Sequence, residues 1–173
     1  MPLICVMGVS AAGKSTVGAA LAEAIGVPFL DADDLHPEAN RNKMAAGVPL
    51  VDEDRWPWLD AVGERFRDDR PTGLVVACSA LRRAYRDRIR RHAADVVFVH
   101  LHGSRELLAA RAASRTGHFM PAALLDSQLV TLEPLESDED GVIADVSVPV
   151  DAAVNRVVDR LCESGRAPAQ SLR

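Results

Sequence analysis

The sequence contains few cysteines, few aromatic residues and no long hydrophobic run. Its three cysteines are an odd number without a CxxC spacing, which disfavours a disulfide framework and a zinc site and fits a reducing cytoplasm. No apolar stretch approaches the roughly 20 residues that a membrane-spanning helix needs, and the N-terminus lacks the basic and apolar regions of a secretory signal. We therefore expect a cytoplasmic protein that has no membrane partner.

Positive charge is also scarce. The 20 lysines and arginines are outnumbered by 25 aspartates and glutamates, which gives a formal net charge of −5. General nucleic-acid binders are usually basic, so we expect no nucleic-acid partner. With 173 residues, of which 48% are hydrophobic, the chain is long enough for one buried core. We expect a single domain over residues 1–165 and a flexible tail over 166–173.

Short apolar runs alternate with helical patterns along the chain. Runs typical of buried parallel strands occur at 3–7, 27–30, 73–78, 96–101 and 142–146. Helices are predicted between and after them, at 16–25, 37–47, 54–69, 80–92, 104–114, 121–131 and 150–163. This alternation predicts an α/β fold with a five-stranded parallel sheet flanked by helices. Ligands of such sheets bind beyond the carboxyl ends of the strands.

The segment GVSAAGKS at residues 8–15 matches the phosphate-binding pattern GxxxxGK[ST] between a predicted strand and a predicted helix. The two glycines permit a tight turn that points loop N–H groups at phosphate oxygens. Lys14 supplies a charge to the β- and γ-phosphates, and Ser15 can bind Mg²⁺. The predicted nucleotide-binding residues here are Gly8, Val9, Ser10, Ala11, Ala12, Gly13, Lys14, Ser15 and Thr16.

This motif identifies a P-loop NTPase, and the rest of the chain narrows its class. We find no NKxD-type motif for reading guanine, and motor or remodelling ATPases are usually longer than 173 residues. A kinase that acts on a small molecule, with ATP as donor and Mg²⁺ as metal, is therefore favoured. A non-catalytic regulator that binds ATP remains an alternative, which turnover would separate from the kinase.

Three aspartates follow the second predicted strand. Asp31 and Asp33 face the same side of an extended strand end. A kinase usually offers its acceptor hydroxyl a carboxylate, so we interpret Asp33 as the catalytic base and Asp31 as a partner of Mg²⁺ through water. The alternative is that these residues cap the next helix, a role that we favour for Asp34.

Two arginines lie four residues apart before the segment TGHF. In small kinases a mobile segment that carries arginines covers the phosphates and excludes water. We predict such a lid at about 111–128, in which Arg111 and Arg115 contact adenine and the transferred charge. Two solvated helix arginines are the alternative. The predicted catalytic residues are thus Lys14, Asp33 and Arg115.

Together these segments resemble the gluconokinase family, whose wider relatives are shikimate kinase and the nucleoside monophosphate kinases. The resemblance rests on MGVSAAGKST (7–16), FLDADDLHPEANRNKMAAGVPLVDEDRWPWL (29–59), CSALRRAYRDRIR (78–90) and RTGHFMPAALLDSQLVTLEPL (115–135). It implies ATP- and Mg²⁺-dependent phosphorylation of D-gluconate to 6-phospho-D-gluconate by a cytoplasmic homodimer. The family often has Gly or Ser where this chain has Ala11 and Ala12, so we expect altered stiffness of the loop without lost binding.

The resemblance also places an acceptor-binding helical segment at about 34–72. Gluconate is an anionic open-chain polyol, so its site needs cations for the carboxylate and hydrogen-bonding groups for the hydroxyls. Another sugar acid, or shikimate, is not excluded by the residues alone. The predicted acceptor-binding residues are Asp33, His36, Asn40, Lys43, Arg82, Arg86 and Gln128.

Other features have simpler interpretations. The basic segment 82–91 is either a solvated helix face or a helix that turns at least one arginine toward the acceptor. His100 and His102 are more typical of a sheet than of half a metal site. The tryptophans at 56 and 58 are interpreted as packing residues, and the acidic run 136–140 as a solvated loop.

Overall fold

The computed structural model describes residues 1–114 and 122–165, so the predicted lid residue Arg115 and the predicted tail 166–173 lie outside the described residues. Five parallel strands form one sheet, as predicted, and their order in it is β2-β3-β1-β4-β5. The strands are β1 (Leu3–Met7), β2 (Phe29–Asp31), β3 (Leu74–Ala77), β4 (Val97–His102) and β5 (Gly141–Asp145).

The helices lie close to the ranges predicted for them. They are α1 (Lys14–Ile25), α2 (Glu38–Ala45), α3 (Asp52–Asp68), α4 (Arg83–Arg90), α5 (Arg105–Ser114), α6 (Ala122–Thr131) and α7 (Val150–Glu163). Helix α4 is shorter than predicted because Ala80 has φ +41° and Arg82 is extended, so the chain turns before the helix begins. No helix in the described part of the chain is both long and apolar enough to cross a membrane.

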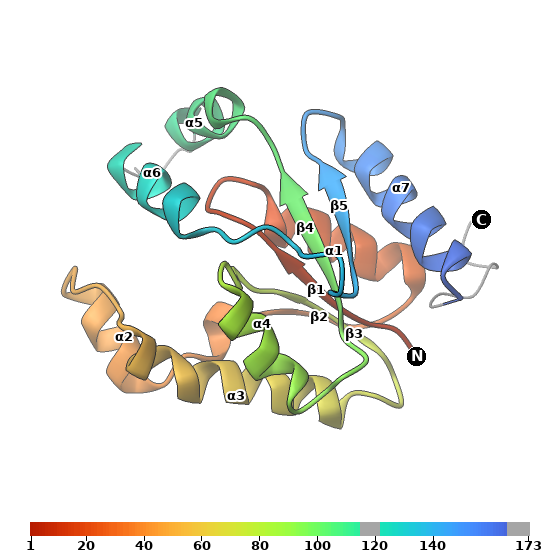
Figure 1. Cartoon of the computed structure of the whole chain (residues 1–173), viewed down its shortest axis with the longest axis horizontal. Coiled ribbons are helices and arrows are strands. Elements are labelled where there is room, and N and C mark those ends of the chain that lie inside the picture. The colour runs from red at the N-terminus through yellow and green to blue at the C-terminus, as the bar shows by residue number, and fades with distance from the viewer. Residues whose placement is uncertain (115–121, 166–173) are drawn as a thin grey trace.

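The sheet is covered on both faces (Figure 1). On one face α1 and α7 pack on Ile4 and Val6 of β1, and on the other α3 and α4 pack on Leu3, Cys5 and Met7. Successive side chains of a strand point to opposite faces, so a central strand buried on both sides must be apolar throughout. This is why the strands read in the sequence as unbroken hydrophobic runs.

The carboxyl ends of three neighbouring strands form the edge where ligands of such sheets bind. Met7 at the end of β1 runs directly into the P-loop, and Asp31 ends β2. Between them, the end of β3 leads into Cys78 and Ser79, which precede α4. Segments that are far apart in sequence, at 8–15, 31–36 and 78–86, therefore meet at one edge of the sheet.

His100 on β4 gives the fold a pH-sensitive group. Its side chain is buried, and within the described residues its Nδ1 has no hydrogen-bond partner. Burial, together with the charges of His102 and Arg86, lowers the pKa of His100 from 6.5 to about 4. The ring is therefore neutral in the folded protein under conditions where it is protonated in the unfolded chain.

We expect His100 to make folding weaker in mild acid. Its folded-state pKa is depressed, so stability is complete above pH 6.5 and is lost as the pH falls toward 4, by up to about 3 kcal/mol. Urea unfolding of wild type and His100→Phe between pH 7.5 and 4 measures this, and the variant should lose less stability over that range. Parallel pH profiles for the two proteins would contradict the assignment.

Candidate active site

The P-loop joins β1 to α1 in a turn that requires unusual backbone angles. Gly8 has φ +142°, and a Cβ there would lie 2.9 Å from the carbonyl oxygen of Leu101, so this position needs glycine. Gly13 has φ +89° and immediately precedes the first residue of α1. The loop therefore delivers backbone N–H groups to a helix N-terminus, where an anion is favoured by both hydrogen bonds and the helix dipole.

Ala11 adopts a conformation that usually belongs to glycine. Its φ is +65°, and a left-handed residue other than glycine costs roughly 1–2 kcal/mol. The resemblance to the family singled out both Ala11 and Ala12. Of these two residues, Ala11 is the one whose backbone is strained. Altered stiffness of the loop stays a prediction, and Ala11 is the residue to which we now attribute it.

Lys14 and Ser15 begin α1 and carry the polar side chains of the loop. The Nζ atom of Lys14 donates to the carbonyl oxygen of Val9 at 3.0 Å, which folds the lysine back over the loop. Ser15 Oγ donates to Asp31 Oδ2 at 2.7 Å. A hydroxyl and a carboxylate oxygen thus lie together beside the phosphate-binding turn, and both are oxygen ligands of the type that Mg²⁺ prefers.

Asp31 also takes the capping role that we had favoured for Asp34. Its Oδ1 accepts a hydrogen bond from the backbone N–H of Asp33 at 3.1 Å, at the start of a 3₁₀ turn over Ala32–Leu35. Asp34 lies inside the turn, whereas Asp31 occupies its N-cap position. One carboxylate therefore orders the turn with one oxygen and contacts Ser15 with the other.

Asp33 is an exposed carboxylate of this turn, and 86% of its side chain is accessible. Partial desolvation and the negative charge of Asp31 raise the pKa of Asp33, while His36 and Lys14 act in the opposite direction. The influence of Lys14 means that Asp33 lies within range of the charge that holds phosphates. A carboxylate in this place can accept a proton from a hydroxyl that attacks the γ-phosphate.

His36 lies behind Asp33 and is held by three contacts. Its ring stacks on Trp58 at 4.2 Å between centroids, and its Nε2 is 3.9 Å from Asp33 Oδ1. Asn40 Nδ2 contacts both His36 Nδ1, at 3.3 Å, and the carbonyl oxygen of Asp54, at 2.8 Å. Because a carbonyl only accepts, the Asn40 nitrogen is the donor, and the ring proton belongs on the Nε2 that faces Asp33.

This arrangement defines what His36 and Asn40 can do. Burial, with the charges of Arg55 and Arg41, lowers the pKa of His36 against the opposing effect of Asp33, so the ring is neutral at pH 7. Asn40 is buried and donates its amide hydrogens to groups inside the protein, so it orients His36. Trp58 anchors the segment, with Nε1 donating to the carbonyl oxygen of Ala32 at 2.7 Å. The packing role predicted for it is confirmed.

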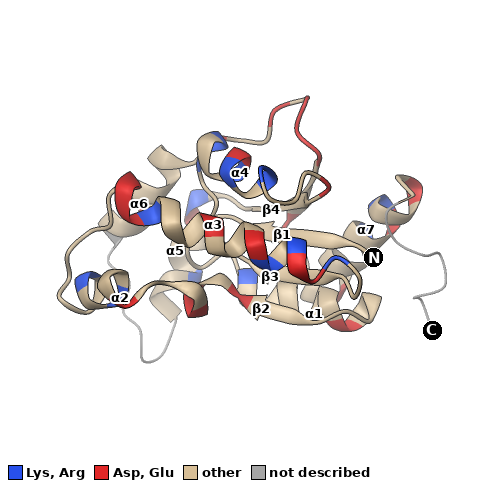
Figure 2. Ribbon diagram, turned by 90° about the horizontal axis from the view of Figure 1, so that it is seen from below, with Lys and Arg blue, Asp and Glu red and all other residues tan. Residues whose placement is uncertain are grey.

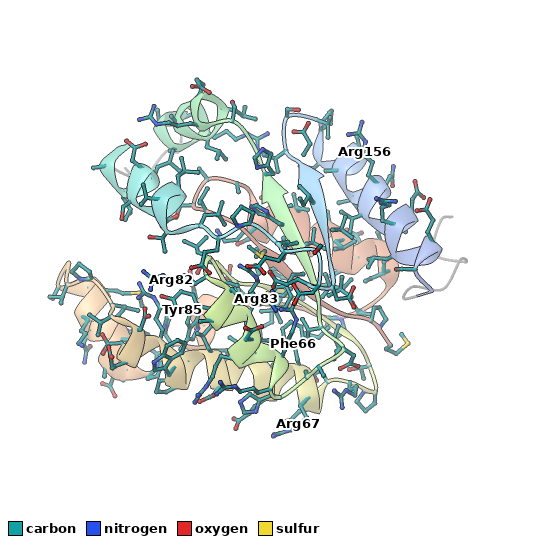
Figure 3. The ribbon with its side chains drawn as sticks, in the orientation of Figure 1. Phe66, Arg67, Arg82, Arg83, Tyr85 and Arg156 are labelled. Carbon is teal, nitrogen blue, oxygen red and sulfur yellow. The ribbon has the colours of Figure 1, made fainter. Side chains whose placement is uncertain are left out.

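A cluster of opposite charges lies at the start of α3, which we call the Asp52 cluster: Asp52, Arg55, Arg82 and Tyr85. Figure 3 shows Arg82 and Tyr85 on the side of α4 that faces α2 and the start of α3. Arg82 was predicted as an acceptor residue, whereas sequence reasoning assigned no role to Asp52, Arg55 or Tyr85. The pattern DEDR in the family-like stretch was the available signal, but it did not indicate which side chains converge.

Lys43 faces the same region from α2 but is already paired. Its Nζ donates to Asp54 Oδ1 at 2.6 Å, and the other oxygen of Asp54 accepts from the N–H of Val51. This hydrogen bonding lowers the pKa of Asp54 and keeps the pair charged. An acceptor that binds Lys43 must share it with Asp54.

Arg86 was predicted to bind the acceptor, and the structure corrects this. Its side chain is fully buried and pairs with the equally buried Glu139, with bonds of 2.7 Å from both Nε and Nη2. The rest of the guanidinium donates to backbone carbonyls, including those of Ala80 and Glu133. No donor of Arg86 is left to face a substrate, so this residue holds α4 in place.

The acidic run 136–140 is a loop whose residues 136–138 are exposed, as predicted, but Glu139 departs from that prediction because its side chain is fully buried. Figure 2 shows this acidic segment next to the basic helix α4. Glu139 also accepts from Arg90 at 2.8 Å, and Asp138 pairs with Arg83. Burial alone would raise the pKa of Glu139, but bonds from Arg86, Arg90 and the N–H of Glu136 outweigh it and lower that pKa to about 2.

Glu139→Gln should therefore be strongly destabilising. Removing one partner of a buried ion pair leaves Arg86 uncompensated, and typically costs about 3–5 kcal/mol. Glu136→Gln is the matched control, since its side chain is 65% exposed and a surface pair contributes about 0–1 kcal/mol. Denaturant unfolding at pH 7 measures the free energy of unfolding of both variants. Equal small losses would show that the ion pair of Glu139 does not stabilise the fold.

Two further predicted residues lie on the nucleotide side. Gln128 was predicted to bind the acceptor, but its Oε1 accepts from the N–H of Ser10 in the P-loop at 2.6 Å. Arg111 donates to the carbonyl oxygen of Val146 at 2.6 Å. It lines a cavity of about 280 Å³ whose other walls are small or apolar residues, Ala11, Ala12, Gly13, Thr16, Val17, Ser114, Val146, Val148, Val150 and Ala153.

The P-loop and the carboxylates that follow β2 therefore lie together at one edge of the sheet, joined by the hydrogen bond from Ser15 to Asp31. This fold and this site define the class of P-loop kinases that phosphorylate small molecules. The model of the shikimate kinase family matches residues 10–162.

Comparison with known proteins narrows the class. A gluconokinase from Arabidopsis thaliana is 41% identical over 179 residues, covering 94% of this chain and 93% of that protein. One from Gluconobacter oxydans is 47% identical over 79% of this chain and 78% of its own length. The crystal structure of a gluconokinase from Sinorhizobium meliloti is 47% identical, with a TM-score of 0.81 and coverage of 94% and 97%. The chain belongs to the gluconokinase family, within the wider shikimate kinase family.

Proposed function

We propose that this protein transfers the γ-phosphoryl group of ATP to the 6-hydroxyl group of D-gluconate and forms 6-phospho-D-gluconate. The observation that carries the proposal is that an exposed carboxylate and a positive charge both lie near His36. Asp33 Oδ1 is 3.9 Å from His36 Nε2, and the charge of Arg55 is near enough to lower the pKa of His36. Names of relatives at 41% and 47% identity point to the same substrate.

We propose that the nucleotide is ATP, with its phosphates in the P-loop and its base in the adjoining cavity. The small apolar walls of that cavity suit a flat ring, and the guanidinium of Arg111 at its edge can stack on it. Gln128, bound to Ser10, helps to fix the loop beside the γ-phosphate. Arg115, predicted to neutralise transferred charge, lies outside the described residues and stays a prediction.

We propose Mg²⁺ as the metal, held by Ser15 and, through water, by Asp31. The adjacent hydroxyl and carboxylate fit this ion, because Mg²⁺ takes oxygen ligands and keeps several waters and phosphate oxygens of its own. When bound, Mg²⁺ neutralises charge on the β- and γ-phosphates.

The residues of the chain perform the remaining steps by positioning and proton transfer. The 6-hydroxyl oxygen attacks the γ-phosphorus as the bond to the β–γ bridging oxygen breaks, and ADP leaves. Asp33 orients the hydroxyl and takes its proton, and the neutral ring of His36 lies 3.9 Å from that carboxylate. Because the transition state is loose, orientation contributes more than strong base catalysis.

The acceptor carboxylate is proposed to bind at the Asp52 cluster. Arg55 and Arg82 supply the cations that an acid requires, and the charge of Arg55 acts on His36, which lies 3.9 Å from Asp33. Residues 34–72 then form the acceptor segment and residues 111–128 the lid. The protein is proposed to be a cytoplasmic homodimer, and light scattering after size-exclusion chromatography tests the dimer.

Release of ADP in the presence of single acceptors tests the proposal. D-gluconate, shikimate and other sugar acids are supplied separately with ATP and Mg²⁺. Stimulation by D-gluconate well above the other acids is expected. Stimulation by shikimate alone would keep the kinase and replace the substrate, and no stimulation with ATP bound would favour a regulator.

Arg82→Ala should raise the KM for gluconate about 10- to 100-fold, since a hydrogen bond to a charged group contributes about 1.5–3 kcal/mol. The KM for ATP should change little, because Arg82 is on the acceptor side. Arg91→Ala, which removes an exposed arginine at the far end of the same helix, is the control. Steady-state kinetics with each substrate varied decide the matter, and equal effects on both KM values would place Arg82 elsewhere.

A further inference from the structure

Three hydrogen-bond donors converge on the carboxylate of Asp52. Tyr85 OH donates to Oδ1 at 2.5 Å and Arg82 Nη1 to Oδ2 at 3.2 Å, while Arg55 Nη1 lies 3.5 Å from Oδ1. Both guanidinium carbons are 5.8 Å from the centre of the Tyr85 ring. Two arginines are thus held by the same acidic residue, and both lie near the same aromatic ring.

The three charged members are open to solution, whereas the aromatic one is not. The side chains of Asp52, Arg55 and Arg82 are 34%, 31% and 44% exposed. Tyr85 is buried; burial and the bond to Asp52 raise the pKa of Tyr85, so its hydroxyl stays neutral and donates. The Asp52 cluster therefore carries two positive charges and one negative charge where a solute can reach it.

Charged side chains on the helices packed near the cluster are largely held in ion pairs of their own. Lys43 of α2 pairs with Asp54, and Arg88 of α4 pairs with Asp60 at 2.5 Å. Arg41 on α2 adds a positive charge closer to His36. The two arginines and Asp52 together give the cluster a net charge of +1. Asp52 is the member that lowers this charge from +2.

We propose that Asp52 is a specificity-determining residue that limits the acceptor site to acids with one negative charge at the bound end. This inference rests on the proposed function, because it concerns the carboxylate of the same acceptor. A single carboxylate brings the cluster to neutrality. A doubly charged group leaves one negative charge uncompensated beside Asp52, in a place where water screens only part of the repulsion.

Asp52→Asn separates this role from a purely structural one. Asparagine keeps the size of the side chain and an oxygen that accepts from Tyr85 or Arg82, but it raises the net charge of the cluster to +2. The site should then prefer a dianion. Glu53→Gln is the matched control, since it makes the same charge change one residue along the chain on an exposed side chain.

The experiment compares D-gluconate with D-glucitol 1-phosphate, an open-chain polyol with a free 6-hydroxyl group and a phosphate in place of the carboxylate. At pH 7.5 this phosphate carries nearly two negative charges. The ratio of kcat/KM for the phosphate to kcat/KM for gluconate should rise roughly 10- to 100-fold in Asp52→Asn, as expected for one added charge at this range. It should not change in Glu53→Gln.

Tyr85→Phe supplies a second comparison, because it removes a hydrogen bond to Asp52 and leaves every charge in place. Its ratio should match that of wild type. If Asp52→Asn weakens both acceptors equally, or if Tyr85→Phe shifts the ratio as much, Asp52 only maintains structure and the inference is overturned.

Calorimetric binding of the two anions to the ADP-bound protein keeps the inference apart from the proposed function. A shift toward the phosphate in Asp52→Asn supports the role of Asp52 even if wild type fails to phosphorylate gluconate, an outcome that would overturn the proposed function alone. If wild type phosphorylates gluconate normally and Asp52→Asn shifts neither the ratio of kcat/KM values nor the ratio of binding affinities, the inference alone is overturned.

Discussion

Asp33→Asn is expected to lower kcat for gluconate by roughly 10²- to 10⁴-fold, the range for loss of a general acid–base group. Asparagine keeps the shape of the side chain but cannot take the proton of the 6-hydroxyl group. Affinity for ATP should stay nearly unchanged, because Asp33 acts through its proximity to the acceptor and contacts His36 rather than the loop. Single-turnover and steady-state rates, with ATP binding measured in parallel, provide the comparison.

Asp34→Asn is the control for that measurement. Asp34 is the next residue along the chain and is exposed. Its substitution by asparagine removes the same charge and should reduce kcat only slightly. A normal rate for Asp33→Asn would mean that Asp33 is not the base. Equal losses in both variants would mean that the segment needs negative charge in general and not a carboxylate at one place.

Lys14→Ala should produce the second large effect, a loss of about 10²-fold or more in kcat/KM for ATP. Lys14 follows Gly13 at the start of α1, where its charge adds to the loop N–H groups that face the phosphates. The loss should extend to binding of ATP and ADP, whereas a nucleoside without phosphates should be unaffected. Calorimetric titration of the three ligands measures this.

Lys43→Ala is the internal control, because the chain contains only two lysines and Lys43 pairs with Asp54 on the acceptor side. It should leave affinity for ATP unchanged. Unchanged affinity for ATP in Lys14→Ala would contradict the assignment of the P-loop.

The parts of the fold that depend on local pattern could be predicted from the sequence. A strand buried on both faces must be apolar, so Leu3–Met7 was recognisable without its neighbours. The P-loop was equally clear, since its glycines, lysine and serine lie within eight residues. The order of the strands was not predicted, because it depends on which edges pair and not on the runs themselves.

The parts of the site that depend on distant contacts could not be predicted in the same way. Arg86 and Arg82 lie in one basic segment, and only the position of Glu139, 53 residues from Arg86, shows which of them is buried. Gln128 contacts Ser10 across 118 residues, so its place on the nucleotide side has no local signal. Arg55 needed the approach of α4 to α3 before it could be recognised as a member of the Asp52 cluster.

The central claim is phosphorylation of D-gluconate at its 6-hydroxyl group, and one coupled assay tests it most directly. Purified protein, ATP, Mg²⁺ and D-gluconate are mixed with 6-phosphogluconate dehydrogenase and NADP⁺, and NADPH absorbance is followed. We predict NADPH formation that requires both ATP and gluconate and disappears in Asp33→Asn. ADP release without NADPH would show transfer of the phosphoryl group to another position or to water, and either this result or the absence of both products would contradict the proposed function.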